Sequence, residues 1–342
     1  MTSAERTESD KYDVVVVGGG VAGLSGGTVL ARAGRSVLVI DAGEPRNAPA
    51  TAVHGFLSRD GIPPGELQDL GRGELAGYGG AVQAGRVATV TGSVGDFTVT
   101  IEDGTTVHAR RLLITTGLVD DLPDVPGLRE RWGRDVLHCP YCHGYEVRNQ
   151  PIGVLSTGPM ATHQALLFGQ WSKDITVFLH TGPQPTDEEW EQLAARNVCV
   201  VDGEVVQVQV TDDALTGVQL RDGTVIPRHA LVVGPRFVAR SDVLTALGIG
   251  LVEHPMGIGS YVETGPGGST DVPGVWAAGN VTDLMAQVVT SAAAGAGAAA
   301  AINADLLDED VRDAVAKRRA PFSAASEAAA CELVGVDRRH GL

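Results

Sequence analysis

Cysteine, aromatic side chains and positive charge are all scarce in this sequence. Four cysteines in 342 residues, with no secretory leader visible, favour a reducing, cytoplasmic compartment in which a cysteine pair is more often catalytic than structural. Lysine and arginine number 26 against 42 acidic residues, and the net charge of −16 argues against nucleic acid and anionic membranes as partners. The longest weakly polar run, Val288 to Ile302, is mostly alanine and glycine and is too short and too mildly apolar for a membrane span.

A dinucleotide-binding fingerprint stands near the start of the chain. The apolar run Tyr12 to Val17 predicts a buried parallel strand, and it leads into Gly18, Gly20 and Gly23 at the G-x-G-x-x-G spacing. We expect a tight turn at the first glycine, close approach to a pyrophosphate at the second, and tight helix packing at the third. Asp41 ends the next predicted strand 18 residues past Gly23, where a ribose-binding acid belongs. A glycine-rich turn in an ordinary α/β domain is the alternative.

The order of elements in this module occurs twice. The first copy continues through a predicted hairpin turn at Asp103-Gly104 and closes with a strand at Leu112–Ile114. The second copy opens with a strand at Ile152–Leu155, turns at Asp222-Gly223 and closes at Leu231–Val233. We therefore predict the α/β class, with two nested Rossmann-like, three-layer ββα dinucleotide-binding domains.

Two cysteines three residues apart carry the clearest chemical signal. Cys139 and Cys142 flank Pro140, which suits the first position of a helix, so both thiols are expected on one helix face. A helix N-terminus lowers the pKa of a nearby thiol and favours the reactive thiolate, which predicts a redox-active dithiol. Four alternatives stay open: half of a zinc site, a c-type haem attachment site, a glutaredoxin-like motif and a structural thiol pair. Cys199 and Cys331 stand alone and offer zinc no second pair.

The second glycine loop departs from the fingerprint. Ser156 stands where the tight-turn glycine should be. After the predicted strand Ile175–Leu179, the segment His180–Pro185 offers neither an acid for a ribose hydroxyl nor an arginine for a 2′-phosphate, and no basic residue occurs between Lys173 and Arg196. We predict that this domain has lost nicotinamide binding. The alternative is a site that tolerates one altered glycine and takes its basic residues from elsewhere.

Four ordered motifs resemble the low-molecular-weight thioredoxin reductase family: Gly18–Gly23, Thr115–Gly117, Cys139–Cys142 and Val275–Asn280. The resemblance implies a homodimer with FAD in a discontinuous domain made by both ends of the chain. The implied division is an FAD-binding domain at residues 1–119 and 246–315, a central dithiol-bearing, degenerate NAD(P)-type domain at 120–245 and a C-terminal extension at 316–342. Besides the three glycines and Asp41, the residues that the resemblance places at the flavin nucleotide are Ala22, Ala42, Arg46, Asn47, Thr116, Gly117, Gly279, Asn280, Gln287, Val288 and Val289.

Departures from the family pattern refine the expected function. Asn280 replaces the usual aspartate, which removes a charge but keeps a hydrogen bond, so FAD is expected to stay bound. His143 replaces the acid that usually follows the second cysteine and can exchange protons near neutral pH. With Ser156 and the missing arginines, the chain resembles the branch of dithiol oxidases that close disulfides in small natural products such as gliotoxin and holomycin. That branch passes electrons from FAD to oxygen.

The resemblance implies a sequence of thiol exchanges. A substrate thiolate attacks Cys139 and frees Cys142 beside the flavin; the second substrate thiol then closes the product disulfide. Molecular oxygen reoxidises the flavin and gives hydrogen peroxide. His143 is assigned the proton transfers, although it could merely orient its helix, and His138 is a weaker candidate. The expected partners are a small dithiol, oxygen and a second copy of the chain, with no metal; His54 and the extension receive no role.

Two other functions remain open. The first is a thioredoxin-disulfide reductase that draws electrons from NADPH or ferredoxin. The second is a non-catalytic flavin-binding protein whose cysteine pair is a redox sensor or merely structural. An FAD-dependent dithiol oxidase is the prediction, and the sequence does not identify its dithiol.

Overall fold

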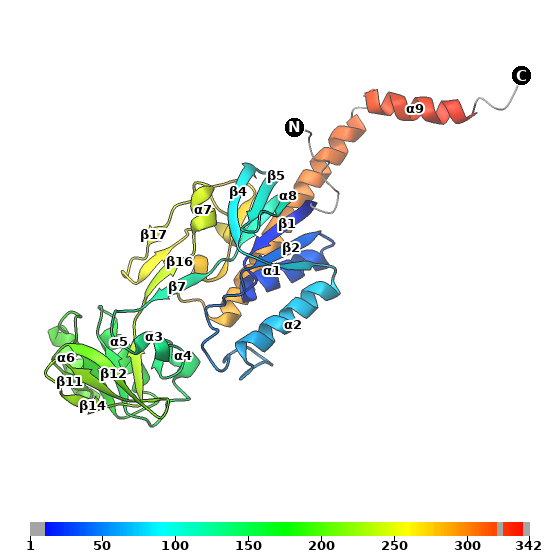
Figure 1. Cartoon of the computed structure of the whole chain (residues 1–342). Helices are drawn as coiled ribbons and strands as arrows, with labels where there is room; N and C mark the ends of the chain where they lie inside the picture. Colours follow the sequence, from blue (N-terminus) through cyan, green and yellow to red (C-terminus); the bar gives the residue numbers. More distant parts are fainter. Residues whose placement is uncertain (1–10, 320–323, 338–342) are drawn as a thin grey trace, which may run out of the picture.

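The computed structural model describes residues 11–319 and 324–337, which form two α/β lobes and a projecting helical arm (Figure 1). One lobe combines segments from the N-terminal and C-terminal parts of the chain, and the other contains the cysteine pair and the second glycine loop. Each lobe has a main sheet with parallel strands at its centre, so the predicted fold class of two Rossmann-like units is confirmed.

A seven-stranded sheet forms the core of the N-terminal lobe. Its order is β3-β2-β1-β6-β5-β4, and β19 pairs with β6. The first strand, β1, is buried along its apolar end because its valines pack on both faces, as the run of β-branched residues predicted. The strands are β1 (Lys11–Val17), β2 (Val37–Asp41), β3 (Ala81–Ala84), β4 (Val87–Ser93), β5 (Asp96–Ile101), β6 (Thr106–Ile114) and β19 (Val275–Ala277).

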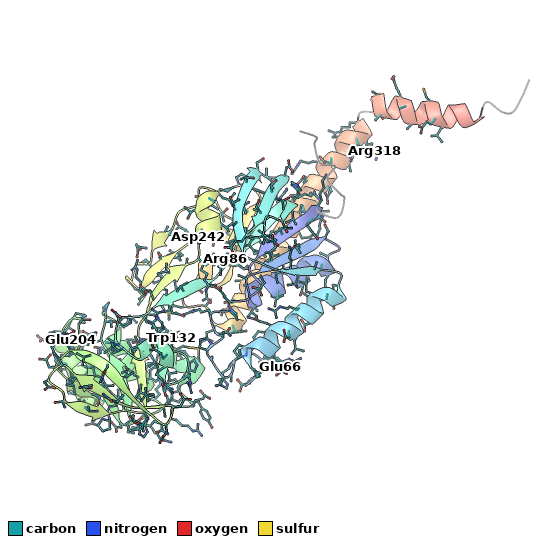
Figure 2. All side chains as sticks on the ribbon, viewed as in Figure 1. Glu66, Arg86, Trp132, Glu204, Asp242 and Arg318 are labelled. Atoms are coloured by element: carbon teal, nitrogen blue, oxygen red, sulfur yellow. A yellow bond between two sulfur atoms is a disulfide. The ribbon has the colours of Figure 1, made fainter. Side chains whose placement is uncertain are left out.

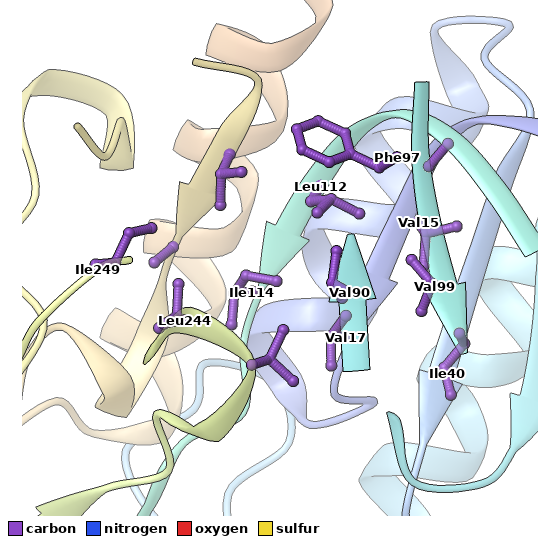
Figure 3. Packing of buried hydrophobic residues seen from close by; sticks show 14 of the residues in the cluster. Val15, Val17, Ile40, Val90, Phe97, Val99, Leu112, Ile114, Leu244 and Ile249 are labelled. Carbon is purple, nitrogen blue, oxygen red and sulfur yellow. The ribbon is translucent and has the colours of Figure 1, made fainter. Parts of the chain in front are cut away.

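Two hydrophobic layers cover the two faces of this sheet. On one face, residues of β1, β2 and β6 pack with β4 and β5 and with the segment around Leu244 and Ile249 (Figure 3). On the other face, Leu113 and Trp276 pack beneath helices that include Leu24 and Ile302. The helices of that face are α1 (Val21–Arg32), α2 (Pro64–Gly77) and α8 (Val288–Arg319). Helices α1 and α8 touch so closely that a Cβ at Gly295 would lie 2.0 Å from the Ala22 carbonyl oxygen.

The central lobe repeats these layers on a smaller scale. A parallel sheet of order β11-β10-β9-β15-β8 lies between an antiparallel sheet, β12-β13-β14, and helix α5. The predicted hairpin turns recur in the two lobes: Asp103 accepts from the Thr105 N–H and Asp222 from the Thr224 N–H. The elements are α3 (Leu128–Arg131), β8 (Val136–Leu137), α4 (Pro140–His143), β9 (Ile152–Leu155), α5 (Ala161–Phe168), β10 (Ile175–Phe178), α6 (Asp187–Ala195), β11 (Cys199–Val201), β12 (Val205–Thr211), β13 (Ala214–Leu220), β14 (Val225–Pro227) and β15 (Ala230–Val233).

A four-stranded sheet lies where the chain passes between the lobes. Its order is β17-β18-β16-β7, and the outgoing strand β7 pairs antiparallel with the returning strand β16. Both crossings thus run side by side, which fixes where the central lobe begins relative to the first glycine loop. The elements here are β7 (Leu118–Asp121), β16 (Arg236–Ala239), α7 (Asp242–Ala246), β17 (Val252–Glu253), β18 (Gly259–Tyr261) and the 3₁₀ turns η2 (Pro266–Gly268) and η3 (Gly279–Val281).

Helix α8 continues past the sheet as an arm. Arg111 of β6 is 2% exposed and forms ion pairs with Asp305 and Glu309, which hold the middle of α8 on the lobe. Beyond these contacts the helix projects away, with Arg318 near its end (Figure 2), and α9 (Ala324–Asp337) follows. Helix α8 therefore runs through the predicted boundary at residue 315. The last residues of the sequence, from Arg338 on, lie outside the described part.

Within residues 11–319 and 324–337, none of the helices combines the length and apolar character needed to cross a bilayer.

Candidate active site

One large cavity joins the two lobes. Its volume is ≈ 1380 Å³, above the usual range for a pocket that holds one small ligand. Arg86 of the N-terminal lobe and Trp132 of the central lobe, both labelled in Figure 2, line this cavity. Of the predicted site residues, those that line this cavity are Gly18, Gly20, Ala22, Asp41, Ala42, Arg46, Asn47, Thr116, Gly117, Cys139, Cys142, His143, Gly279, Asn280, Gln287 and Val288. The tertiary structure thus brings together residues that are up to 270 positions apart in the sequence.

The first glycine loop presents bare backbone to this cavity. Gly18 has φ +107°, and a Cβ there would lie 2.4 Å from the Thr115 carbonyl oxygen, so only glycine makes this turn without strain. A Cβ at Gly23 would lie 2.0 Å from the Gly18 carbonyl oxygen, so Gly23 packs the helix and does not line the cavity. The side of Gly20 is open, with no atom within 4 Å of a Cβ built there. The N–H groups at the start of α1 are therefore accessible to an anionic ligand.

Asp41 is fixed at the carboxyl end of β2. Its Oδ1 accepts from the N–H groups of Gly19 and Gly43 at 3.2 and 3.3 Å, and its Oδ2 accepts from Arg72 Nη2 at 3.0 Å. A Cβ at Gly19 would lie 2.6 Å from the Asp41 side chain, so glycine is needed at this position too. Gly19 and Arg72 were absent from our prediction. The triple glycine was a visible signal for Gly19, whereas nothing local to Arg72 indicates its contact with Asp41.

The segment after β6 and the turn before α8 complete this half of the cavity. Thr115 Oγ1 donates to the Gly18 carbonyl at 2.8 Å and so fixes the first loop, a contact that we did not predict. Thr116 Oγ1 donates to the Arg240 carbonyl at 2.5 Å. The Asn280 amide donates to the Asp283 and Ala286 carbonyls at 3.1 and 2.9 Å, which leaves Oδ1 as its acceptor for a ligand. Val289 is 40% exposed and does not line the cavity, unlike Gln287 and Val288 before it.

Cys139 and Cys142 form a disulfide on the opposite side of the cavity. Pro140 is the first residue of α4, as predicted, with Cys139 as its extended N-cap. The helix is only one turn long, so the helix dipole contributes little to thiol reactivity here, in contrast to our expectation. Among the residues that the structure describes, no group of three histidine, cysteine or acidic side chains is arranged to hold a metal ion.

Two histidines flank the disulfide in different environments. Burial lowers the pKa of His143, the nearby Glu146 carboxylate raises it in part, and His54 lowers it further. Both ring nitrogens of His143 are buried, and neither makes a well-formed hydrogen bond in the described chain, although the Cys139 backbone lies close enough to raise the pKa in part. The ring is therefore neutral at pH 7 and free to take a proton from a group in the cavity. His138 also has a pKa lowered by burial, but its Nδ1 lies 3.2 Å from the Val233 carbonyl oxygen, which fixes the ring.

The second glycine loop lines the far end of the same cavity, from Thr157 to Ala161, but its first residue does not. Ser156 is buried, and a Cβ at Gly182 would lie 2.0 Å from Ser156 Oγ. The serine side chain thus occupies the space between this loop and the loop after β10. Pro159 and Met160 follow and present apolar surface to the cavity.

Arginines at the cavity wall are matched to carboxylates. Arg46 donates to both oxygens of Asp120 at 2.9 and 2.7 Å, so only part of its guanidinium remains for a phosphate. The other pairs are Arg86 with Glu44 at 2.7 Å, Arg236 with Glu253 at 2.6 Å and Arg240 with Glu44 at 4.0 Å. This arrangement leaves little uncommitted positive side-chain charge on the part of the wall that these four arginines form.

The N-terminal half of the cavity fits a flavin dinucleotide. The exposed backbone at Gly20 accommodates a pyrophosphate, Asp41 stands where a ribose hydroxyl can donate to it, and Asn280 Oδ1 offers a further acceptor. The remaining volume lies beside the disulfide and the apolar second loop. Such a cavity has room for a bound cofactor and for a substrate next to it.

Comparison with known proteins gives consistent results. Residues 12–296 match the family described as pyridine nucleotide-disulphide oxidoreductase. Thioredoxin reductase sirT of Leptosphaeria maculans is 32% identical over 88% of this chain and 96% of its own length. The crystal structure of HlmI is 46% identical, covers 94% of this chain and 100% of HlmI, and has a TM-score of 0.87. The structure of an oxidoreductase from Agrobacterium tumefaciens is 38% identical, and the match covers 87% of this chain and 99% of that oxidoreductase with a TM-score of 0.82.

Proposed function

The chain belongs to the pyridine nucleotide-disulphide oxidoreductase family, and we propose that within it the protein is an FAD-dependent dithiol oxidase. The protein is an oxidoreductase of the thioredoxin reductase-like type and binds FAD as a flavoprotein. The proposed reaction closes an intramolecular disulfide in a small natural-product dithiol and delivers the electrons to molecular oxygen. We also propose that the protein works as a cytoplasmic homodimer.

One observation carries this proposal. The disulfide of Cys139 and Cys142 faces the same cavity as the first glycine loop, while the second glycine loop is altered at Ser156. The first loop supports FAD binding, and the disulfide supports thiol exchange. The buried serine, the apolar Pro159 and Met160, and the lack of a basic residue between Lys173 and Arg196 argue against a reduced nicotinamide nucleotide as electron donor. Electrons then enter from a thiol substrate.

The cysteines carry the exchange chemistry. A substrate thiolate attacks Cys139 Sγ, the bond between the two cysteine sulfurs breaks, and Cys142 leaves as a thiolate. The second substrate thiol attacks the sulfur of its own molecule in the mixed disulfide, which forms the product disulfide and releases Cys139 as a thiolate. The substrate loses two electrons and two protons in total. Bound FAD supplies the two-electron acceptor that restores the enzyme disulfide and the site from which oxygen removes the electrons as hydrogen peroxide.

His143 holds the position of the proton acceptor. Its ring is neutral, makes no well-formed hydrogen bond in the described chain, and belongs to the residue directly after Cys142. A neutral imidazole can take the proton of the attacking substrate thiol and later pass it on. His138 is held by Val233 and therefore orients the wall of the site rather than moving protons.

The relative sirT is named a thioredoxin reductase, which supports a second candidate, a thioredoxin reductase supplied by NADPH or ferredoxin. Anaerobic titration of the FAD-loaded protein separates the two. We expect dithiothreitol to bleach the flavin, air to restore the colour with one hydrogen peroxide per dithiol, and NADPH to have no effect. Bleaching by micromolar NADPH, or reduction of thioredoxin, would favour the reductase.

Cysteine variants test the assigned chemistry. Cys139→Ser and Cys142→Ser should each abolish dithiol-dependent oxygen consumption, because exchange needs both sulfurs. Cys199→Ser is the matched control, since Cys199 is an exposed free thiol on β11. Equal activity in all three variants would show that the cysteine pair is structural.

A further inference from the structure

A short loop of the N-terminal lobe is held in one conformation beside the dithiol. Val53 and Ile62 close it with a backbone bridge, in which the Val53 N–H donates to the Ile62 carbonyl at 2.8 Å. Inside it, the Gly55 N–H donates to Asp60 Oδ1 at 2.9 Å, and Ser58 adopts a left-handed φ of +69°. Non-glycine residues rarely adopt this conformation, so it persists only where surrounding contacts fix the loop.

This loop directs His54 toward the central lobe. His54 Nδ1 lies 3.4 Å from Asp60 Oδ1 within the loop, and its Nε2 lies 3.4 Å from Glu146 Oε1 across the boundary. The His54 side chain is 25% exposed, and it lines the cavity that contains the disulfide. One imidazole therefore contacts a carboxylate from each lobe.

Glu146 belongs to the segment that carries the reactive cysteines. It lies four residues after Cys142 and three after His143, the residue at which the single turn of α4 ends. Among the described residues, neither ring nitrogen of His143 makes a hydrogen bond to the N-terminal lobe that would anchor this turn. The contact of Glu146 with His54 thus gives the dithiol segment a polar attachment to the lobe that contains the first glycine loop.

We propose that His54 is a positioning residue that holds the Cys139–Cys142 segment against the N-terminal lobe through Glu146. The proposal rests on the function proposed above. Electron transfer between a thiolate and a cofactor requires that the reacting groups stay close and aligned, and loosening a support outside the reacting atoms reduces the rate. His54 takes no part in bond making, so the reaction of reduced flavin with oxygen is independent of it.

The first experiment separates these two half-reactions in the FAD-loaded full chain. His54→Ala should slow anaerobic flavin bleaching by dithiothreitol roughly fivefold, the upper end for losing a partly exposed contact with a carboxylate. Reoxidation of dithionite-reduced flavin by air should keep its rate. His229→Ala is the matched control, because His229 is exposed and bonds Gln150 within the central lobe at 2.8 Å. An unchanged bleaching rate in His54→Ala would overturn the proposal.

A double-mutant cycle tests whether the two residues act through each other. Glu146→Gln should slow bleaching by a similar factor, and the double variant should be no slower than either single variant. Additive losses would show that each residue acts alone and would contradict the proposed positioning of the dithiol segment by His54 through Glu146.

A second measurement does not depend on the proposed oxidase activity. After reduction with a phosphine, alkylation of Cys139 and Cys142 by iodoacetamide should be roughly fivefold faster in His54→Ala, because the segment detaches more often. Cys199 serves as the internal reference and should be alkylated at an unchanged rate. If dithiothreitol fails to bleach the wild-type flavin, the oxidase proposal fails. Equal alkylation rates in the wild type and in His54→Ala would reject the positioning role of His54.

Discussion

The two glycine loops share a scaffold and differ in what they can bind. The Gly18 N–H donates to the Ile40 carbonyl at 2.8 Å, and the Ser156 N–H donates to the Phe178 carbonyl at 2.9 Å, so the two residues are structural counterparts. At the first, a left-handed glycine turns the chain and leaves the next residues open. At the second, a buried serine side chain fills the space against Gly182.

The same difference appears at the end of the second strand of each unit. Asp41 follows Ile40, whereas Leu179 follows Phe178 and is 5% exposed in the core. Strand, turn and helix are built alike in both units, because apolar packing holds them in each. Ligand chemistry depends on a few side chains at the carboxyl edge of the sheet and can be lost separately.

The largest effect is expected from a substitution that disrupts the packing of helix α1 on the first glycine loop. Gly23→Ala places a Cβ 2.0 Å from the Gly18 carbonyl oxygen, so helix α1 must move away from the loop. We expect a loss of about 3 kcal/mol in unfolding free energy and colourless protein. Ala161→Gly at the matching position of the central unit should retain flavin. Denaturant unfolding and the flavin absorbance measure both, and a yellow, stable Gly23→Ala protein would contradict the packing argument.

A second prediction concerns the histidine of the dithiol unit. His143→Gln should slow dithiol-dependent flavin bleaching about 100-fold, the loss typical of a proton acceptor. Burial lowers the pKa of His143, so the wild-type rate should hold at pH 7 and decline only below the ordinary value of about 6.5. This decline of the bleaching rate at low pH should be absent in His143→Gln and present in His138→Gln. If the decline persists in His143→Gln, another group accepts the proton of the substrate thiol.

The pKa of His143 also affects folding. Because the unfolded chain binds a proton at higher pH than the folded chain, His143 reduces stability as pH falls below about 6.5. His143→Gln should remove that reduction, which unfolding at pH 7 and pH 5.5 measures.

A smaller effect is expected at the ribose position of the first unit. Asp41→Asn keeps an acceptor but removes one of the two carboxylates that Arg72 contacts, the other being Asp69, so FAD affinity should fall about tenfold. Asp103→Asn, in a surface turn of the same lobe, is the control. The dissociation constant of FAD can be measured by following flavin release through its fluorescence. Equal affinities in both variants would show that Asp41 is only structural.

The smallest expected effect is in the second loop. Ser156→Gly restores the sequence pattern but not the missing acid at Leu179, so NADPH should still fail to bleach the flavin. The added backbone freedom should lower the unfolding free energy by about 0.5–1 kcal/mol. NADPH-dependent bleaching in this variant would mean that the Ser156 side chain alone prevents the second unit from using NADPH.

Local patterns in the sequence were sufficient to predict much of this molecule. The β-branched run of β1, the glycine spacing and the paired Asp-Gly turns all act through neighbouring residues, and the strands and hairpins formed where they indicated. Pro140 began its helix for the same local reason. Roles that the family resemblance assigned to individual residues, such as Arg46 and Asn47, stay predictions.

Other features depend on contacts between distant segments. The Arg72 contact with Asp41, the Arg46 pair with Asp120 and the link between His54 and Glu146 join residues that no periodicity relates. The short length of α4 was missed because the proline marks where a helix begins and carries no information about where it ends.

The sequence by itself determined two Rossmann-like units, a vicinal dithiol and a serine in place of the first glycine of the second loop, because each follows from the conformations and chemistry of adjacent residues. The tertiary structure decided that the disulfide, the first loop and the second loop share one cavity. It also decided that the arginines of that cavity are already paired and that the ring nitrogens of His143 are buried without a well-formed hydrogen bond in the described chain. Burial and ion pairing are set by which surfaces meet, and that depends on packing between the lobes.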